Sequence, residues 1–562
     1  NEGFVLTDDV IGPLIPQTIS SLIGIINNKL LTEKSKVLAL NILSFLSRFN
    51  GQLFLQSMAS TQPIVLDILN NINSNTNIMV ALSQVVVNMA RLDESLSYTP
   101  PVFHQLLQMC SGSNFRISLE AIKTATQVIL TFEGRNVTEQ LGLTNVTNGL
   151  VDIIHSDIDH EIKEQTVLCI GVILRTQQEF LDGPFYRKTF ECIESLLSNA
   201  LLRSDALVAI RKCLNPSTLN LLDKSDILFQ EAYSQTKQAR RQDKTEALQI
   251  CEKIISSSKL SNQTVTDTFE SISEYALSTD AVELGLAVRI LSDMFKYKID
   301  KKKVLDVYKT IITMIKDSRV RENVLPYFIS MTEAVSNINR SKTVKIITDV
   351  GDSACSKTSL VMIGTLYGAA IEDVNPVMNK VNTAIEDLTQ PNNTSQHVEK
   401  SLTLLYALAY IARKGLITDT ESLIPKLYNL FSSDVDGIRY AAGVALGSLP
   451  AAKQFIFKRL EEGKVDNSLL VALKESLANV DVSEAEEIIT RLQKVTPNEN
   501  IIVSLTECYG RLMMKDIATS ITKYYIPSLR SQTADPALVG SIKVCLNECD
   551  VKHFIPDRKS VV

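Results

Sequence analysis

The chain contains no tryptophan, few aromatic residues and few glycines. Aromatic residues make up 6% of the 562 residues, and glycine occurs 21 times. β-Sandwiches depend on aromatic and β-branched strands, and many α/β enzymes depend on glycine-rich loops. The composition therefore disfavours both classes. It favours helices, and the sequence is correspondingly rich in Leu, Ile, Val, Ala and Ser.

A strong net charge and a long apolar run are also missing. The formal charge is −6 and the isoelectric point is about 5.7, which gives no general reason to bind nucleic acid or an anionic membrane and weakly favours a basic protein partner. The longest apolar runs, such as "LLYALAYIA" at 404–412, are too short to cross a bilayer. The chain begins with Asn1 rather than Met, so we expect it to be part of a longer protein.

The cysteines form no CxxC pair, and their number is odd. Because most of them lie among apolar residues, we predict reduced, buried thiols, and therefore a protein of the cytoplasm and nucleus. The nine positions are Cys110, Cys169, Cys192, Cys213, Cys251, Cys355, Cys508, Cys545 and Cys549.

Two segments of the chain resemble each other closely. "SDVDGIRYAAGVALGSL" at 433–449 and "SDIDHEIKEQTVLCIGVIL" at 156–174 both open on Asp-x-Asp. Arg439 in the first corresponds to Lys163 in the second, and Gly447 corresponds to Gly171. Two copies in one chain indicate a repeated architecture rather than a single charged site.

The same helical pattern recurs along the whole chain at a spacing of about forty residues, which is typical of HEAT-type helix pairs. We therefore predict an all-α HEAT/armadillo-type solenoid of about 13 to 14 helix pairs over residues 1–550, with a weak break or loop near 386–400 and a C-terminal tail at 551–562. The pattern begins in successive copies at Ser35, Ile78, Ile117, Ile162, Leu202, Asp243, Val282, Val320, Thr358, Val398, Ile438, Leu469, Ile501 and Leu538.

The charges that recur in these two segments have a structural interpretation. Asp434 or Asp436 in one copy, and Asp157 or Asp159 in the other, can accept hydrogen bonds at the start of the second helix as N-caps do. Glycine deep in a helix costs about 1 kcal/mol relative to alanine, and close approach of a neighbouring helix would account for Gly447 and Gly171. Contact of these charges with a partner is the alternative interpretation.

The segment "GDSACSKT" at 351–358 is the nearest approach to a catalytic signature. Gly351, Lys357 and Thr358 fit a phosphate-binding loop, which needs glycines so that backbone N–H groups can surround the phosphates. Ser356 occupies the position of the second glycine, and no parallel sheet surrounds the segment. We therefore interpret it as a turn followed by the start of a helix.

Other polar clusters also favour structural roles. The turn that carries His155, His160 and Glu161 contains the residue types of a metal site, but its spacing suits a solvated capping turn better. Cys545 and Cys549 share a helix face without a second pair to complete a zinc site. The remaining histidines are His104, His397 and His553.

Charged runs are expected to be solvated. "RLEEGK" at 459–464 and "SEAEEII" at 483–489 are typical of exposed helix faces, and "KYKIDKKK" at 296–303 is a basic patch between helices. This patch has Phe295 and Tyr297 beside its lysines but stands alone, and a single patch of this kind does not predict nucleic-acid binding. The sequence thus identifies no catalytic, cofactor-binding or metal-binding residue, and it identifies no partner-contact residue.

Three stretches of the chain resemble the cullin-associated, neddylation-dissociated family of HEAT-repeat proteins, in its middle and later repeats. "SGSNFRISLEAIKTATQVIL" leads into the segment at 156–174, "LLRSDALVAIRKCLNPSTLNLLD" follows at 201–223, and "VEKSLTLLYALAYIARKGLI" precedes the segment at 433–449. The resemblance implies a non-catalytic scaffold without cofactors. It implies a partner in the unneddylated cullin–RING ubiquitin ligase, whose substrate receptors the scaffold would help to exchange.

A nuclear-transport carrier of the importin-β kind is the alternative function for the same fold. It predicts acidic runs along the second helices, and the acidic stretches of this sequence are not placed regularly there. In both cases we expect a protein partner, no nucleic acid, no membrane, and a monomer until the partner binds.

Overall fold

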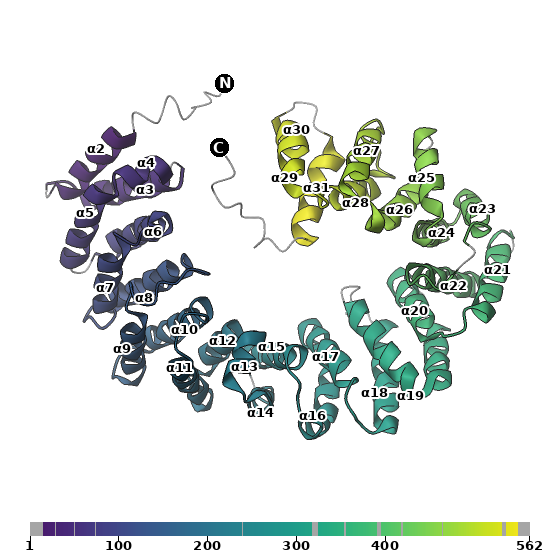
Figure 1. The fold of residues 1–562 in the computed structure, drawn as a ribbon, viewed down its shortest axis with the longest axis horizontal. Helices are drawn as coiled ribbons and strands as arrows, with labels where there is room; N and C mark the ends of the chain where they lie inside the picture. Colours follow the sequence, from purple (N-terminus) through teal and green to yellow (C-terminus); the bar gives the residue numbers. More distant parts are fainter. Residues whose placement is uncertain are drawn as a thin grey trace. The chain divides into compact units, whose positions relative to one another are not determined.

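A computed structural model describes residues 15–548, except 29, 50, 73–74, 239, 317–323, 353–355, 391–394, 418–419, 464 and 531–534. Helices account for the regular structure of these residues, and none of them lies in a strand (Figure 1). The predicted tail at 551–562 lies outside the described residues, as do Val320, Cys355, Cys549 and His553.

The chain divides into two compact units, Asn1–Glu270 and Ser271–Val562. The boundary falls within α16 (Asn262–Tyr275). The helices of the first unit that precede it are α2 (Ile15–Asn27), α3 (Glu33–Phe49), α4 (Gly51–Gln56), α5 (Met58–Asn71), α6 (Thr76–Leu92), α7 (Thr99–Met109), α8 (Phe115–Leu130), α9 (Leu143–His155), α10 (His160–Thr176), α11 (Gly183–Ser195), η2 (Leu196–Ser198), α12 (Arg203–Cys213), α13 (Pro216–Leu222), α14 (Ser225–Gln235) and α15 (Arg241–Ser257).

The second unit continues with the same kind of helix pair. Its helices after α16 are α17 (Ala281–Met294), α18 (Lys301–Thr313), η3 (Met314–Lys316), α19 (Leu325–Gly351), α20 (Lys357–Ala370), α21 (Asn375–Leu388), α22 (Ser395–Arg413), α23 (Leu423–Asn429), η5 (Leu430–Ser432), α24 (Asp436–Ser448), α25 (Ala452–Glu461), α26 (Asn467–Ser476), η6 (Leu477–Asn479), α27 (Val482–Leu492), α28 (Ile502–Met513), α29 (Ile517–Ser520), η7 (Ile521–Tyr525), α30 (Ile526–Arg530) and α31 (Pro536–Glu548).

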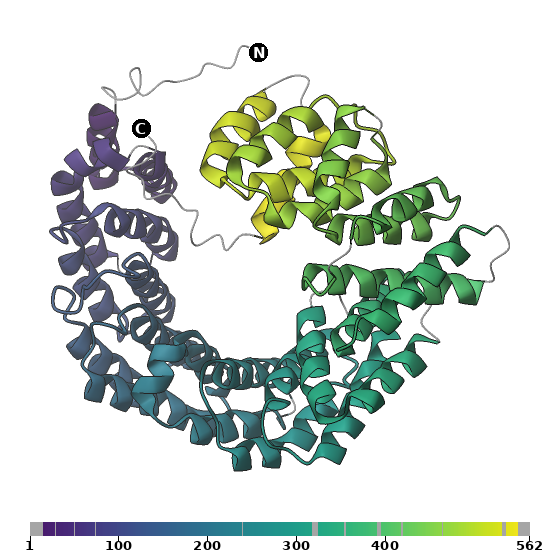
Figure 2. The same cartoon turned by 45° about the vertical axis from the view of Figure 1, so that its right-hand side comes forward.

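Within each unit the second helices of successive pairs lie side by side in one row, which we call the inner row. It comprises α3, α6, α8, α10, α12 and α15 in the first unit, and α20, α22, α24, α26 and α28 in the second (Figures 1 and 2). The predicted register is confirmed, because nearly every start of the repeat pattern lies in the first turn of a second helix. Leu202 and Ile501 are the N-cap residues of α12 and α28, and Val320 is not described.

The long helix α19 is two helices joined at a kink. Asn339 has φ −158° and ψ 88° inside it, so the first part is a second helix and the part after Asn339 is the first helix of the next pair. The Asn339 side chain accepts a hydrogen bond from the backbone N–H of Lys342 at 3.1 Å, as an N-cap does. The helix pairs therefore keep their regular spacing here, although the two parts of α19 are joined at a kink and not by a loop.

The inner row is buried on most sides of its helices. In α24 every residue from Ala441 to Ser448 is buried, together with Ile438. A helix of the outer row buries one stripe only, as α27 does with Ala485, Ile488, Ile489 and Leu492. Such a stripe at helical spacing covers one neighbouring layer, whereas α24 contacts the pairs before and after it. The core of each unit is thus a continuous layer that runs beneath the inner row.

Glycines allow helices of the inner row to approach closely. A β-carbon on Gly447 of α24 would lie 2.1 Å from the carbonyl oxygen of Ala472 in α26, and one on Gly171 of α10 would lie 2.7 Å from the β-carbon of Ala209 in α12. Real β-carbons do not approach other atoms at these distances. The predicted reason for both glycines, close packing against the next helix, is confirmed.

Capping follows the prediction in one copy of the repeat and not in the other. Asp159 is the N-cap of α10, and its side chain accepts from the backbone N–H of Glu161 at 3.0 Å. The prediction for Asp434 or Asp436 is wrong, because Val435 holds the N-cap position of α24 without a side-chain bond. Asp436 instead pairs with Arg439, one turn further along the same helix.

The connection between α21, which ends at Leu388, and α22, which begins at Ser395, falls within the segment 386–400; Pro391 lies outside the described residues. That this segment is a weak break in the solenoid stays a prediction. Whether one continuous solenoid covers 1–550 remains a prediction. No helix in the described part of the chain is both long and apolar enough to span a membrane.

Substitution of Gly447 by alanine is expected to loosen the contact between α24 and α26. The new methyl group meets the backbone of Ala472, and overpacking of this kind costs about 1 to 3 kcal/mol, which outweighs the gain of about 1 kcal/mol in helix propensity. Hydrogen exchange measured by mass spectrometry should become faster in the peptides of α24 and α26.

The control for this substitution is Gly149→Ala in α9, where no atom lies within 4 Å of the new β-carbon and the residue is exposed. This variant should exchange as slowly as the unmodified protein, or more slowly. Unchanged exchange in Gly447→Ala would contradict the close approach of the two helices.

Thiol labelling is expected to separate Cys192 from the other described cysteines. Cys192 is half-buried, whereas the remaining described thiols are buried and unbonded to one another. Burial raises the pKa of Cys169 to about 11 and the pKa values of Cys213 and Cys508 to about 12, so almost no reactive thiolate is present at neutral pH. Burial also raises the pKa values of Cys110 and Cys251.

With N-ethylmaleimide at pH 7.5, Cys192 should be modified at least about tenfold faster than these five residues, as read from peptide masses. In guanidinium chloride all six should react at similar rates. A buried cysteine that reacts as fast as Cys192 in the folded protein would contradict the packing described for its helix.

Candidate partner-binding surface

A polar cleft of about 800 Å³ lies along the turns that precede three helices of the inner row in the second unit. The turns before α24, α26 and α28 contribute exposed side chains that include Asp434, Asn467 and Asn500. Three consecutive pairs place these turns at the same edge of the stack, because the repeat has a fixed register. The cleft is therefore a product of the repeat, although no single pair contains it.

Two lysines lie near the ring of Tyr440 in α24, which lines this cleft. The ammonium group of Lys357 at the start of α20 lies 3.3 Å from the centre of the Tyr440 ring, and that of Lys474 in α26 lies 6.0 Å from it. A cation over the face of an aromatic ring is attracted to it by about 0.5 to 2 kcal/mol. The tyrosine ring is thus held in place by residues from two other helix pairs.

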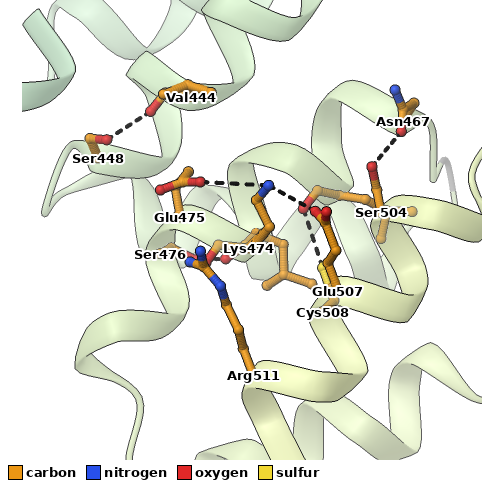
Figure 3. A network of polar contacts seen from close by, with 12 residues as sticks. Val444, Ser448, Asn467, Lys474, Glu475, Ser476, Ser504, Glu507, Cys508 and Arg511 are labelled. Atoms are coloured by element: carbon orange, nitrogen blue, oxygen red, sulfur yellow. Dashed lines mark hydrogen bonds and ion pairs between the residues drawn. The ribbon is translucent and has the colours of Figure 1, made fainter. Parts of the chain in front are cut away.

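Lys474 is the centre of a network of polar contacts, shown in Figure 3. Its ammonium group lies 2.8 Å from a carboxylate oxygen of Glu507 and 3.8 Å from one of Glu475. Burial by itself would lower the pKa of Lys474, but the hydrogen bond to Glu507 and the charges of Tyr440 and Glu475 raise it above its ordinary value. Lys474 therefore remains charged and tied to both neighbours at physiological pH.

The helices α26 and α28 are joined by polar groups at matching positions. The Ser504 hydroxyl donates to Oδ1 of Asn467 at 2.7 Å, and Cys508 Sγ lies 3.3 Å from the carbonyl oxygen of Leu470 (Figure 3). Arg511 continues the stripe by donating to the carbonyl oxygen of Lys474 at 3.1 Å.

Lys515 completes the same stripe, since it donates to the carbonyl oxygen of Ala478 at 3.1 Å. Carbonyl groups in the last turn of a helix have no partner within it, so Arg511 of α28 and Lys515 after it bind carbonyl groups at the end of α26 and in η6. In the first unit Lys253 of α15 does the same for α12, with the carbonyl oxygens of Arg211 and Leu214 at 2.7 and 3.2 Å.

Several charged side chains of the second unit are paired across pairs of helices. Arg413 of α22 lies 2.7 Å from Glu475 of α26, and the Tyr410 hydroxyl of α22 donates to Glu333 of α19 at 3.0 Å. Burial and the adjacent Glu333 raise the pKa of Tyr410, which keeps its hydroxyl protonated. Paired charges fix the helices relative to one another and leave little net field to attract an oppositely charged ligand.

Uncharged hydrogen-bonding groups remain available in the cleft. The Asn500 side chain has no hydrogen-bond partner among the described residues, and the Asn467 amide uses only its oxygen. An asparagine amide offers both a donor and an acceptor, which match the C=O and N–H groups of a peptide backbone. The cleft can therefore bind the main chain of a protein partner.

The segment "GDSACSKT" contains the start of a helix, as predicted. Gly351 ends α19, residues 353–355 are not described, and Ser356 is the N-cap of α20 in a reciprocal capping box with Ser359. Thr358 lies in the first turn of α20. Among the described residues of the segment, Lys357 lines the cleft, where it contacts Tyr440.

The histidines and cysteines considered as metal ligands lie apart. His160 pairs with Glu164 of its own helix at 3.2 Å, and His155 ends α9. His104 contacts the carbonyl oxygen of Leu141 at 3.2 Å, and Cys545 is buried in α31. In the part of the chain that the structure describes, no three His, Cys, Asp or Glu side chains are grouped so that they could hold a metal ion.

The two acidic runs lie on exposed faces of the outer helices, and they also join these helices. Glu461 of α25 pairs with Arg491 of α27 at 2.9 Å, and Glu484 of α27 pairs with Lys453 of α25 at 2.7 Å. The exposure agrees with the sequence prediction. The partners could not be predicted, because each one lies in a neighbouring repeat.

Sequence reasoning named Lys357, Asp434 and Asp436 without predicting that they line one cleft, and it missed Asn467 and Asn500. These residues belong to different helix pairs, so no single motif contains them. The one available signal was the repeat itself, because residues about one period apart on second helices become neighbours. Ser504 and Asn467, which occupy such positions, illustrate this.

Comparison with known proteins identifies the fold of the chain but does not assign it to a family. No family model and no curated protein matches the chain. The solved structure of Kap95p, whose binding induces the switch loops of RanGDP to adopt the GTP-bound conformation, is 10% identical, with a TM-score of 0.52 over 97% of this chain and 75% of that one. The karyopherin Kap121p bound to the SUMO protease Ulp1p is 13% identical, with a TM-score of 0.47 over 96% of this chain and 63% of that one.

The Kap95p structure is similar to this chain in fold. The likeness to Kap95p and the helix pairs described above agree, and the predicted class of fold is confirmed. The chain is an all-helical HEAT-repeat solenoid.

Proposed function

We propose that the protein is an interaction scaffold of the karyopherin kind, a carrier that holds a protein client along its inner row in the cytoplasm and nucleus. The likeness in fold to Kap95p over 97% of this chain is the observation that carries the proposal. By analogy with that protein, a Ran-type GTPase is the first partner to test.

The polar cleft of the second unit is the proposed contact site. Asn467 and Asn500 offer amide groups to the main chain of the client, and the Tyr440 ring offers a flat apolar face. Extended interfaces of this type gain most of their affinity from a few aromatic and polar anchors. Many weaker contacts along the row would add shape complementarity and exclude water.

Electrostatic attraction contributes little to this proposal. Among the carboxylates that line the cleft, Asp436 is paired with Arg439, and Asp466 accepts a hydrogen bond from the backbone N–H of Leu469. A strongly basic client would have to displace these pairs. We therefore expect a client that is recognised through hydrogen bonds and shape, with association that depends only weakly on salt.

An unneddylated cullin–RING complex is the second candidate client. It is favoured by the ordered series of segments at 156–174, 201–223 and 433–449, which resembles the cullin-associated, neddylation-dissociated family. Exchange of substrate receptors by such a scaffold requires that scaffold and receptor weaken each other's binding to the cullin. Both candidates use the same fold, and the client distinguishes them.

Binding to immobilised full-length chain should separate the two candidates. The analytes are Ran loaded with GDP, Ran loaded with GTP, unmodified cullin–RING complex and its neddylated form. The carrier proposal predicts retention of Ran in one nucleotide state and no difference between the two cullin forms. Retention of the unmodified cullin alone would replace the carrier proposal with the second candidate, and retention of neither would remove both.

The variant Tyr440→Ala/Asn500→Ala should lower affinity for the retained client at least about tenfold, because a truncated aromatic anchor typically costs 2 kcal/mol or more. The matched control is Gln454→Ala/Lys458→Ala on the exposed face of α25 in the outer row, which should bind normally. Circular dichroism verifies that both variants are folded. Equal affinity for the two variants would contradict the placement of the contact site in the cleft.

A further inference from the structure

A second cleft, of about 600 Å³, lies between α18 and the part of α19 that follows Asn339. These two segments are first helices of consecutive pairs, so the cleft belongs to the outer row and is separate from the polar cleft described above. Its lining consists of Lys301, Lys302, Leu305, Asp306, Lys309, Ile338, Asn339, Lys342, Lys345, Ile346 and Asp349.

The cleft is strongly basic in a chain of net negative charge. Five of its lining residues are exposed lysines and two are aspartates, whereas the whole chain carries −6. No ion pair involves any of these five lysines in the described part of the chain. Like charges that outnumber the opposite charges around them are unfavourable, so this arrangement is not explained by the stability of the fold.

The spacing of apolar residues in the sequence explains why both helices carry lysines on the side that faces the cleft. On α18 the buried stripe is Val304, Tyr308, Ile311 and Ile312, which places Lys301, Leu305 and Lys309 together on a different face at helical spacing. On α19 the buried residues Thr343, Ile347 and Val350 do the same for Lys342, Lys345 and Ile346. The fixed packing of the two helices therefore brings the lysines together.

The floor of the cleft is apolar. Leu305, Ile338 and Ile346 line it and are only half-buried, which leaves apolar surface open between the two rows of lysines. An apolar floor with a charged rim suits a peptide that carries both apolar and charged side chains. A lysine rim selects acidic side chains, because each ammonium group can pair with a separate carboxylate.

Phosphate-rich ligands fit the cleft less well. A phosphate group has no apolar part to cover Leu305, Ile338 and Ile346. Binding of single-stranded nucleic acid would need exposed aromatic rings for base stacking, and no aromatic side chain lines the cleft. Charge complementarity and the apolar floor together favour an acidic peptide.

We propose that the cleft between α18 and α19 binds an acidic, partly apolar segment of a partner protein. Lys301 and Lys302 of the segment "KYKIDKKK" at 296–303, with Lys309, then form one side of this site, and Lys342 and Lys345, about one repeat later, form the other side. The proposal does not depend on the client of the inner row, because the residues of the two surfaces do not overlap.

Fluorescence anisotropy with the full chain tests the proposal. The probe is a labelled 14-residue peptide of glutamate with leucine at positions 1, 4, 5, 8, 11 and 12, and the competing ligands are a 14-nucleotide oligouridylate and inositol hexakisphosphate. We expect micromolar binding of the peptide that weakens as salt rises from 50 to 200 mM. We expect weaker binding of the other two ligands, and of a peptide in which serine replaces leucine.

Two variants and one control locate the site. Replacement of Lys302, Lys309, Lys342 and Lys345 by glutamine should reduce affinity for the peptide about tenfold or more. The variant Leu305→Asn/Ile346→Asn should also reduce it, and should leave binding of the serine peptide unchanged. The control replaces the exposed lysines Lys123, Lys188, Lys212 and Lys259 of the first unit by glutamine, which changes the net charge equally and should leave the affinity unchanged.

Three results would overturn the proposal. The first is an equal loss of affinity in the control and in the lysine variant. The second is tighter binding of the oligouridylate or the hexakisphosphate than of the leucine peptide. The third is no binding of the peptide by the unmodified chain. Circular dichroism and thermal unfolding establish that every variant is folded before its affinity is compared.

Discussion

Each helix pair leaves one apolar side that only the next pair can cover, and the rest of the structure depends on this contact between neighbours. The inner helix α24 shows its extent, since the whole stretch from Ala441 to Ser448 is buried. An isolated pair with this composition would expose that surface to water at about 25 cal/mol for each Å². The period of about forty residues is therefore a requirement of packing, because each pair must present the same face at the same height.

Neighbouring inner helices are joined in two different ways. Between α24 and α26 the contact is steric, because Gly447 allows the backbone of Ala472 to come close. Between α26 and α28 the contact is polar, through Lys474, Glu507 and Arg511. Where two backbones touch at a glycine, no polar side chain is available to bind a ligand. Where the contact is made by polar side chains, neighbouring amides such as Asn467 lie at the surface. The polar cleft lies where both kinds of contact occur in succession.

The sequence predicts the parts of this molecule that depend on local periodicity. The sequence correctly predicts that second helices start near Ile117, Ile162 and Ile438. The apolar spacing that marks such a start lies within a single short segment of the sequence. The contact of Lys357 with Tyr440, and the proximity of Lys301 to Lys342, depend on distances set by whole helix pairs. The prediction that Asp436 caps its helix is wrong for a related reason. Side-chain geometry decides that Asp436 pairs with Arg439 instead of with the N–H groups at the start of the helix.

The separation of the two clefts by row has a consequence for how the molecule can work. The polar cleft is built from turns of the inner row, and the basic cleft from faces of the outer row. Outer helices bury only one stripe, so their remaining faces can change charge without cost to the core. Inner helices lack this freedom, because nearly every side of them is packed. Specific charge recognition is therefore easier to build on the outer row, and recognition by shape and hydrogen bonds on the inner row.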